Sequence, residues 1–212
     1  MTFAYAAYKK QRRQFVLGAD DLESYSGGKE FKVKIYGSRF AFCVTGCSNP
    51  ALAFDYYSAL NDLPEVPKSP AEFVDNIWGI TLEYTKQQIA KFGKDPDFEE
   101  RLNATSVLIF FDSIEFSLFR IDFGFAKDIV VAGKKPGEIE CLNEGEIHYF
   151  ARAKQLNPVN CRVPDDFFAN PKYSLENLIK KDRLTLGHES YLIGELGSFS
   201  EFKNDSLQLV TA

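Results

Sequence analysis

The sequence has few of the side chains on which most hydrolytic and metal sites depend. Its 212 residues include two histidines, four cysteines, one methionine and one tryptophan. His148 and His188 are far apart in the sequence, and a Ser/His or Cys/His hydrolase would have to depend on one of them. Cys43 and Cys47 have a C-x₃-C spacing, but no later Cys or His pair completes a zinc set. We therefore expect free thiols, no metal site and no cofactor.

Long apolar runs, an excess of basic residues and repeats are also missing. No stretch approaches the ~18 apolar residues of a membrane span, and no signal-peptide core follows the start, so we expect a cytoplasmic protein without a membrane partner. The net charge of −5 argues against binding nucleic acid through charge. The basic cluster 9–13 indicates a solvated hairpin tip, with contact to an acidic partner as the alternative. With no linker visible, we expect a single domain over residues 1–212.

The first part of the chain is rich in short apolar segments. Their alternation and the turns between them are typical of antiparallel hairpins. The predicted strands are 2–8, 15–20, 31–35 and 40–44. Two helices are then predicted over 51–60 and 69–92, the second with Ser69 and Glu72 as a capping box.

The second part returns to strands, with large apolar groups on both faces of some of them. This pattern suits a sheet that is covered on both sides. The predicted strands are 106–111, 114–122, 127–132, 137–142, 191–196 and 207–210, with helices over 145–155 and 174–182. Strands, two helices, strands, two helices and strands in this order predict an α+β protein.

Four residues near the start carry a family resemblance. Thr2 follows the initiator Met, Asp20 ends an apolar strand, Lys32 lies in the next strand pattern, and Gly46 follows the strand after that. In this order they resemble the N-terminal half of proteasome β-type subunits and bacterial HslV peptidases, which are N-terminal-nucleophile (Ntn) hydrolases. The spacing from Lys32 to Gly46 is that of the family. The resemblance implies a four-layer αββα sandwich of two antiparallel sheets, a homo-oligomer, and a peptide or amide substrate.

The resemblance also implies a role for each residue. Thr2 would be the nucleophile, Asp20 and Lys32 would support it, and the Gly46 N–H would face the oxyanion. A partial match in the second half implies that Asp182 and Thr185, expected at and just after the end of a helix, lie beside the Thr2 amine. Where the family has a serine in a turn before another helix, this chain has Glu146.

The chemistry of these residue types fits such a site. A threonine hydroxyl needs a base, and a free α-amine, with an unperturbed pKa of ~8, can be that base once Met1 is removed. The Lys32 ammonium would lower the pKa of this amine, and Asp20 would hold Lys32 in place. An oxyanion donor such as the Gly46 N–H contributes roughly 3 kcal/mol in other hydrolases. The sequence therefore predicts a threonine-type amidohydrolase, most simply a peptidase.

Plainer interpretations remain open for the same residues. Thr is common at position 2, Asp20 could cap a turn with Asp21, and Lys32 could be a solvated strand residue. Asp182 and Thr185 could mark a helix end and nothing more. The alternative function is a non-catalytic proteasome-like subunit that acts in assembly or partner binding, and retention of Met1 would favour it.

Overall fold

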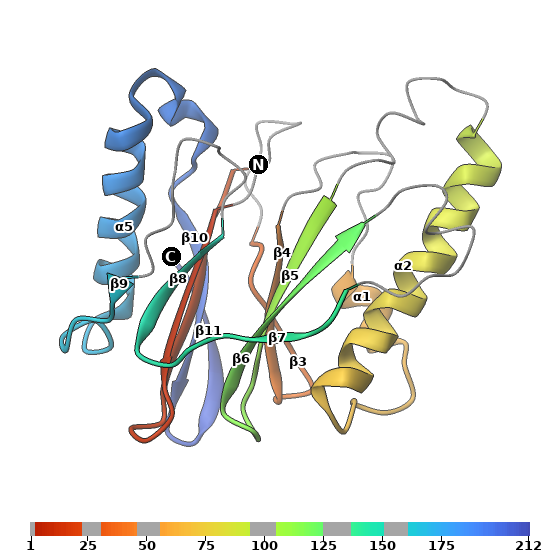
Figure 1. Ribbon diagram of the computed structural model, residues 1–212, viewed down its shortest axis with the longest axis horizontal. Helices are drawn as coiled ribbons and strands as arrows, with labels where there is room; N and C mark the ends of the chain where they lie inside the picture. Colours follow the sequence, from red (N-terminus) through yellow and green to blue (C-terminus); the bar gives the residue numbers. More distant parts are fainter. Residues whose placement is uncertain (1–2, 23–30, 46–55, 94–104, 125–136, 151–160) are drawn as a thin grey trace.

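The computed structural model describes residues 3–22, 31–45, 56–93, 105–124, 137–150 and 161–212. Within them the chain forms two antiparallel sheets that lie face to face, with helices along their outer sides (Figure 1). The predicted α+β class is confirmed. In this part of the chain no helix is both long enough and apolar enough to cross a bilayer.

The first sheet is built around the N-terminal hairpin of β1 and β2. Its strand order is β11-β10-β2-β1-β8-β9, so the hairpin lies at the centre. The bounds are Ala4–Lys9 (β1), Gln14–Asp20 (β2), Glu146–Phe150 (β8), Cys161–Arg162 (β9), Leu196–Lys203 (β10) and Ser206–Thr211 (β11). In the β2–β10 ladder Asp20 is opposite Leu196. The last residue of β2 thus meets the entry to β10, although the two are far apart in the sequence.

The second sheet has the strand order β3-β4-β5-β6-β7. Its bounds are Lys34–Tyr36 (β3), Phe40–Thr45 (β4), Thr105–Asp112 (β5), Ser117–Gly124 (β6) and Glu140–Cys141 (β7). The predicted turn between β3 and β4 has positive φ at Gly37 (56°) and Ser38 (55°). Two successive positive φ values are typical of the tight turns whose twist matches a hairpin.

The helices have clear start signals. Their bounds are Tyr56–Asn61 (α1), Pro70–Phe92 (α2) and Pro171–Leu186 (α5), and α5 continues into a 3₁₀ helix, η2, over Gly187–Leu192. The Ser69 side chain accepts the Glu72 N–H at 3.1 Å, as the predicted cap requires. The Glu72 carboxylate accepts the N–H of Lys68 at 2.7 Å, one residue before the position of an ideal capping box.

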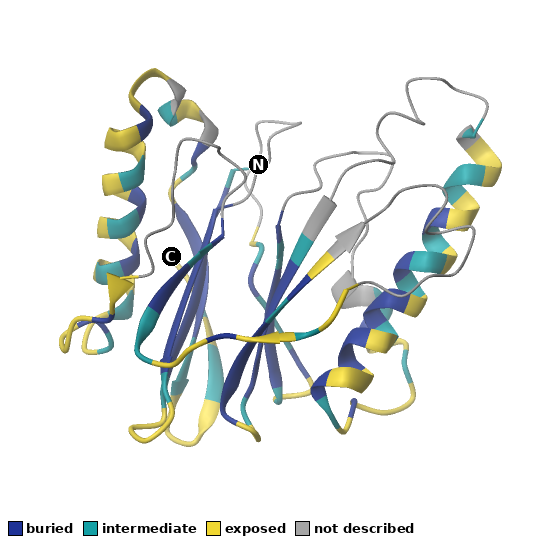
Figure 2. Ribbon diagram, in the orientation of Figure 1, coloured by how far each residue is buried: buried dark blue, intermediate teal, exposed yellow. Residues whose placement is uncertain are grey.

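Apolar side chains fill three layers of contact. The layer between the two sheets includes alternate residues of β1, β2, β4 and β5, and Phe15 stacks on Phe111 there with ring centroids 3.8 Å apart. The intervening residues of β4 and β5 pack on α2, and those of β1 pack with α5. Both faces of these strands are therefore covered, as the sequence pattern predicts, and the buried residues gather on the strands (Figure 2).

The predicted helix over 145–155 is wrong, because residues 146–150 form β8. β8 pairs with β1, with His148 opposite Ala6 and Phe150 opposite Ala4. Ile147 packs toward α5, whereas Phe150 packs between the sheets. A short apolar run that is buried on both sides cannot be assigned to helix or strand from periodicity alone, and pairing with β1 decides it here.

Four strand predictions are only partly right. The strand predicted over 114–122 begins at Ser117, because residues 113–116 form the turn between β5 and β6. The strand predicted over 31–35 begins at Lys34, since the Val33 N–H donates to the Ser198 side chain at 3.3 Å. Of 137–142 only β7 is a strand, and of 191–196 only Leu196 is, since η2 takes up residues 187–192. The strand predicted over 127–132 lies outside the described residues.

Candidate functional site

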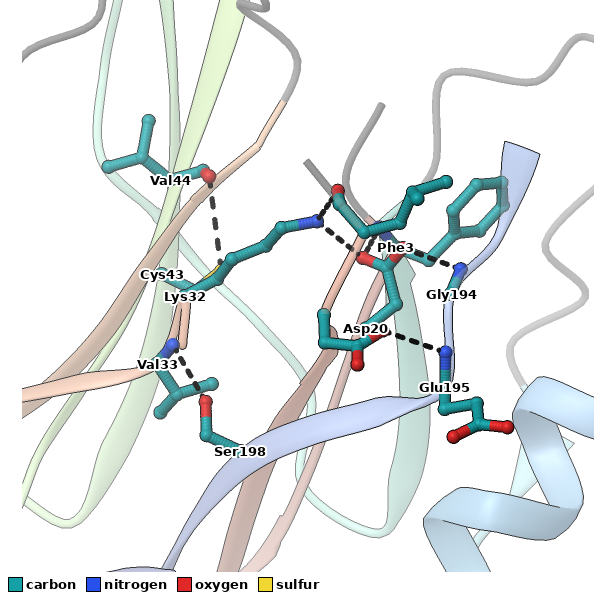
Figure 3. Close-up of polar contacts among 11 residues, drawn as sticks. Phe3, Asp20, Lys32, Val33, Cys43, Val44, Gly194, Glu195 and Ser198 are labelled. Atoms are coloured by element: carbon teal, nitrogen blue, oxygen red, sulfur yellow. Dashed lines mark hydrogen bonds and ion pairs between the residues drawn. The ribbon is translucent and has the colours of Figure 1, made fainter. Parts of the chain in front are cut away.

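Asp20 is the last residue of β2, and it is fully buried although burial strongly disfavours a carboxylate charge. Three donors offset this. Oδ1 accepts the Phe3 N–H at 2.9 Å and the Lys32 ammonium at 2.8 Å, and Oδ2 accepts the Gly194 N–H at 3.0 Å (Figure 3). The carboxylate thus joins the first described residue, the residues before β3 and the entry to β10.

Lys32 is buried with Asp20 rather than solvated. Its side chain is 6% exposed, and its Nζ also donates to the backbone oxygen of Leu22 at 2.6 Å. The neighbouring residue Val33 is buried between the sheets, which fixes the chain on the C-terminal side of Lys32. An ammonium has three donors, and two of them have acceptors among the described residues.

The sequence reasoning missed the segment that closes this site from the C-terminal part of the chain. The Glu195 N–H donates to Asp21 Oδ1 at 2.9 Å, and the Asp21 N–H donates to the backbone oxygen of Glu195 at 2.8 Å. A Cβ at Gly194 would lie 2.4 Å from Asp21 Oδ1, and one at Gly197 would lie 2.6 Å from Asp21 Cβ. Two glycines three residues apart at the start of a strand were the available signal of this close approach.

Thr2 and Gly46 lie outside the described residues, so the structure does not test their predicted places. Phe3, the next residue after Thr2, is described. Its N–H donates to Asp20, its carbonyl accepts the Asp20 N–H at 3.0 Å, and its side chain is fully buried. The chain is therefore fixed by both backbone groups one residue after Thr2.

Asp182 and Thr185 do not lie beside the Asp20–Lys32 pair, and each contacts another residue instead. The prediction that a helix ends at Asp182 is wrong, because α5 continues to Leu186. Asp182 accepts the Tyr5 hydroxyl at 2.5 Å, and Thr185 is exposed and donates to the backbone oxygen of Lys181 at 3.0 Å. Among the described residues neither contacts Asp20 or Lys32, and Asp182 is linked to the site only through β1.

Tyr5 and its neighbour Tyr149 form a buried contact between β1, β8 and α5. They are opposite each other in the ladder, and their rings meet edge to face with centroids 4.9 Å apart. Burial raises the pKa of both phenols far above the ordinary value, and the Asp182 carboxylate adds to the effect. Both phenols are therefore neutral, and Tyr5 is a fixed donor that ties β1 to α5.

Glu146 lies far from Asp20 and does not take the place of the family's serine. It begins β8, which runs antiparallel to β1, so its neighbourhood is the Lys9 end of β1. The Gly145 N–H next to it donates to the backbone oxygen of Tyr8 at 2.9 Å. The opposite end of β8, at Phe150, is the one level with Ala4. The residues that follow Phe150 lie outside the described part.

The described site can position a proton acceptor but contains no metal cluster. No group of three or more His, Cys, Asp or Glu side chains within the described ranges could hold a metal ion. What it offers is a buried ammonium and a buried carboxylate next to the start of the chain. Such a pair alters the protonation of groups beside it through charge, because the low local dielectric strengthens the interaction.

Solved structures of Anbu proteins have a similar fold. Anbu, described as an ancestral beta-subunit, from Yersinia bercovieri matches 99% of this chain and 87% of its own, with 12% identity and a TM-score of 0.53. A Gly-1 mutant of Anbu from Hyphomicrobium sp. strain MC1 matches 100% of this chain and 88% of its own, with 11% identity and a TM-score of 0.52. No protein-family model matches the sequence, and neither does any curated protein.

At these identities the likeness concerns the fold alone. It does not assign the chain to the proteasome β-subunits or to the HslV peptidases. The fold of this chain is thus similar to that of the Anbu proteins.

Proposed function

We propose that this protein is a threonine-type Ntn amidohydrolase, most simply a peptidase, with Thr2 as nucleophile after removal of Met1. The observation that carries this is the buried Asp20–Lys32 pair, whose carboxylate also holds the Phe3 N–H. Consecutive Cα atoms are ~3.8 Å apart, so Thr2 follows within one residue of a backbone that this pair fixes. Burying a charge pair is offset only by good geometry and by hydrogen bonds to its remaining groups, and one Lys32 donor has no acceptor among the described residues.

In this proposal the free α-amine of Thr2 takes the proton of the Thr2 hydroxyl. The positive charge of Lys32 lowers the pKa of the amine, so that more of it is neutral and basic at physiological pH. The hydroxyl oxygen attacks the amide carbon, the Gly46 N–H stabilises the oxyanion, and the amine of the leaving group takes up the proton. Water then hydrolyses the resulting ester and regenerates Thr2.

The remaining residues act at a distance or frame the site. Asp182 holds Tyr5 and thereby β1, and Thr185 is a helix residue with no direct part. The whole chain, 1–212, is one four-layer αββα domain, supported by the two facing sheets and the helices packed on their outer sides. We also propose a cytoplasmic homo-oligomer, because of the resemblance to proteasome β-type subunits and because the 20 Phe residues leave many large apolar groups to cover.

The second candidate is a non-catalytic subunit of the same fold. It is favoured by one observation: a second buried ion pair, Arg39–Asp112, lies far from Asp20 and has no catalytic explanation. A buried pair beside Phe3 could be structural in the same way. In that case Met1 is retained and the protein works through contacts with partners.

The experiment combines intact mass with turnover. Mass spectrometry of untagged protein establishes whether Met1 is lost, and the Met1-free protein is assayed on a panel of short fluorogenic peptides. We expect turnover by the parent and only background by Thr2→Ala, which removes a hydroxyl and a methyl and should leave the melting temperature almost unchanged. Equal turnover by parent and Thr2→Ala would move the active site elsewhere. Retained Met1 together with no turnover would establish the non-catalytic candidate.

A further inference from the structure

A cavity of about 590 Å³ lies at the end of the first sheet that is remote from Asp20. Its wall comes from the end of β1 and the turn after it, the loop before β8, and β9. β1 has six residues, so at ~3.3 Å per residue its ends are about 17 Å apart. The N-terminus and the β1–β2 turn indeed lie at opposite ends of the sheet (Figure 1). The cavity is therefore separate from the candidate site.

Three cationic side chains line this cavity: Lys9, Arg12 and Arg162. Lys9 has a partner, since its Nζ lies 3.4 Å from the carboxylate of Asp165. Within the described part of the chain Arg12 and Arg162 have no ion-pair partner. Guanidinium groups bind carboxylates and phosphates in a planar, two-donor geometry. Two of them at one cavity, without a carboxylate of their own, can receive an anionic group.

Glu146 also lines this cavity, and one of its two carboxylate oxygens lacks a partner. Its Oε2 is shielded from solvent and accepts no hydrogen bond from any described residue. Arg162 is directly opposite in the β8–β9 ladder, yet the two side chains form no ion pair in the structure. The neighbouring carboxylate behaves differently, because Glu144 accepts the Lys10 N–H at 2.8 Å. A carboxylate oxygen without a donor is destabilising, and an ammonium in the cavity would supply that donor once the Glu146 side chain turns an oxygen toward it.

We propose that this cavity binds a small zwitterion, a molecule with a carboxylate for Arg12 and Arg162 and an ammonium for Glu146. A plain anion would leave Glu146 unsatisfied, and a plain cation would meet the two arginines. At ~30 Å³ per water the cavity has the volume of about twenty waters, far more than one inorganic ion needs. Directly opposed cross-strand residues have Cβ atoms ~5 Å apart, which favours a short spacer between the two ligand charges.

The probes are ω-amino acids from glycine to 5-aminopentanoate, which contain no amide bond and cannot be substrates of an amidohydrolase. Binding is followed by amide chemical shifts of the full-length protein, which also locate the site. We expect saturable shifts at residues 144–146 and 161–162. The best binder is then compared with the carboxylate and the amine of the same carbon chain. Each should bind about tenfold or more weakly, since each lacks one charged hydrogen-bonding group.

Variants assign the two ends of the ligand. Glu146→Gln should weaken the zwitterion about tenfold and leave the plain carboxylate almost unaffected, because only the ammonium contact is lost. Arg162→Gln should weaken the binding of both the zwitterion and the plain carboxylate. Lys180→Gln is a control with the same charge change on the exposed side of α5, and it should weaken the binding of neither. Phosphate or the plain carboxylate binding as tightly as the zwitterion would overturn the proposal. So would an absence of shifts, or shifts that gather around Asp20 instead.

Discussion

The Asp20–Lys32 pair and the Arg39–Asp112 pair are both buried, but their donors are arranged differently. Arg39 donates to both oxygens of Asp112, from Nε at 3.0 Å and Nη2 at 2.6 Å, and its Nη1 donates to the backbone oxygen of Pro67 at 3.2 Å. Its guanidinium also lies over the Phe40 ring, 4.8 Å from the centroid. The cation is thus held on every side by fixed partners.

Lys32 makes a single contact with its carboxylate and a second with a backbone oxygen, so one donor of the ammonium remains for a group outside the described residues. The places differ too. Asp112 is next to Phe111, which stacks on Phe15 at the start of β2, whereas Asp20 is at the end of β2. The pairs lie at opposite ends of the inter-sheet core. The comparison suggests that the arginine pair closes the fold and that the lysine pair serves the chain start.

The largest predicted effect is the loss of peptide turnover when Lys32 is replaced. We expect Lys32→Ala to reduce turnover of the peptide panel to background, because the amine of Thr2 loses the charge that lowers its pKa. It also leaves Asp20 without its cation, at roughly 3–5 kcal/mol of stability, so turnover must be normalised to the folded fraction from a melting curve. Lys32→Arg should recover only part of the rate, since the guanidinium differs in shape and reach. Full activity of Lys32→Ala would refute the role given to this residue.

Replacing Arg39 should give the opposite result. Arg39→Ala leaves Asp112 buried with the Ile114 N–H as its remaining described donor, and should cost roughly 3–5 kcal/mol in the free energy of unfolding. Turnover per folded molecule should be unchanged, because the pair is remote from Asp20 and Lys32. Urea denaturation and the peptide assay measure the two quantities. Loss of turnover in the folded fraction would show that the two ends are coupled.

Gly194 tests whether the backbone around Asp20 tolerates movement. A Cβ there would lie 2.4 Å from Asp21 Oδ1 and 2.6 Å from the Leu22 nitrogen, so Gly194→Ala should destabilise by about 1–3 kcal/mol. Gly79→Ala is the matched control. Gly79 lies within α2 with nothing within 4 Å of a Cβ, and alanine there should stabilise by about 0.5–1 kcal/mol. Equal effects of the two changes in urea denaturation would contradict the close approach.

The smallest effect concerns the pH dependence of stability at Tyr8, near the end of β1 that is remote from Asp20. Tyr8 donates its hydroxyl to the backbone oxygen of Leu142 at 2.7 Å, and burial raises its pKa to about 12. The folded pKa exceeds the unfolded value of ~10, so this stabilisation is complete below pH ~10 and is lost as the pH rises through about 12. Tyr8→Phe should flatten the fall in unfolding free energy over that range. Parallel curves for parent and variant would contradict this assignment.

The sequence predicted the strands best where apolar runs lie between clear turns. The hairpin of β1 and β2, β4, β5 and the start of α2 follow from such runs and caps. It failed at β8, because a segment buried on both faces has no distinguishing period. It also placed the end of α5 too early, although Gly187, which has a positive φ of 56°, follows Leu186 and is the usual signal of a helix C-terminus.

The charged side chains of the candidate site could be predicted from the sequence, but the backbone groups that contact them could not. Asp20 and Lys32 were identified from order and spacing, and the structure brings them together. The donors from Phe3 and Gly194 and the acceptor at Leu22 are backbone groups, which every residue carries and no motif distinguishes. The pairing of β1 with β2 brings Phe3 to Asp20, and the approach of β10 to β2 brings Gly194.

The most direct test of the catalytic proposal is to locate a covalent adduct. Met1-free protein is treated with a peptide carrying a β-lactone, which a serine or threonine hydroxyl opens to an ester, and the labelled residue is mapped by tandem mass spectrometry. We predict one equivalent of label on Thr2 in the parent and in folded Arg39→Ala, and none in Lys32→Ala. Label on another residue, or equal labelling of Thr2 in Lys32→Ala, would contradict the role of the Asp20–Lys32 pair.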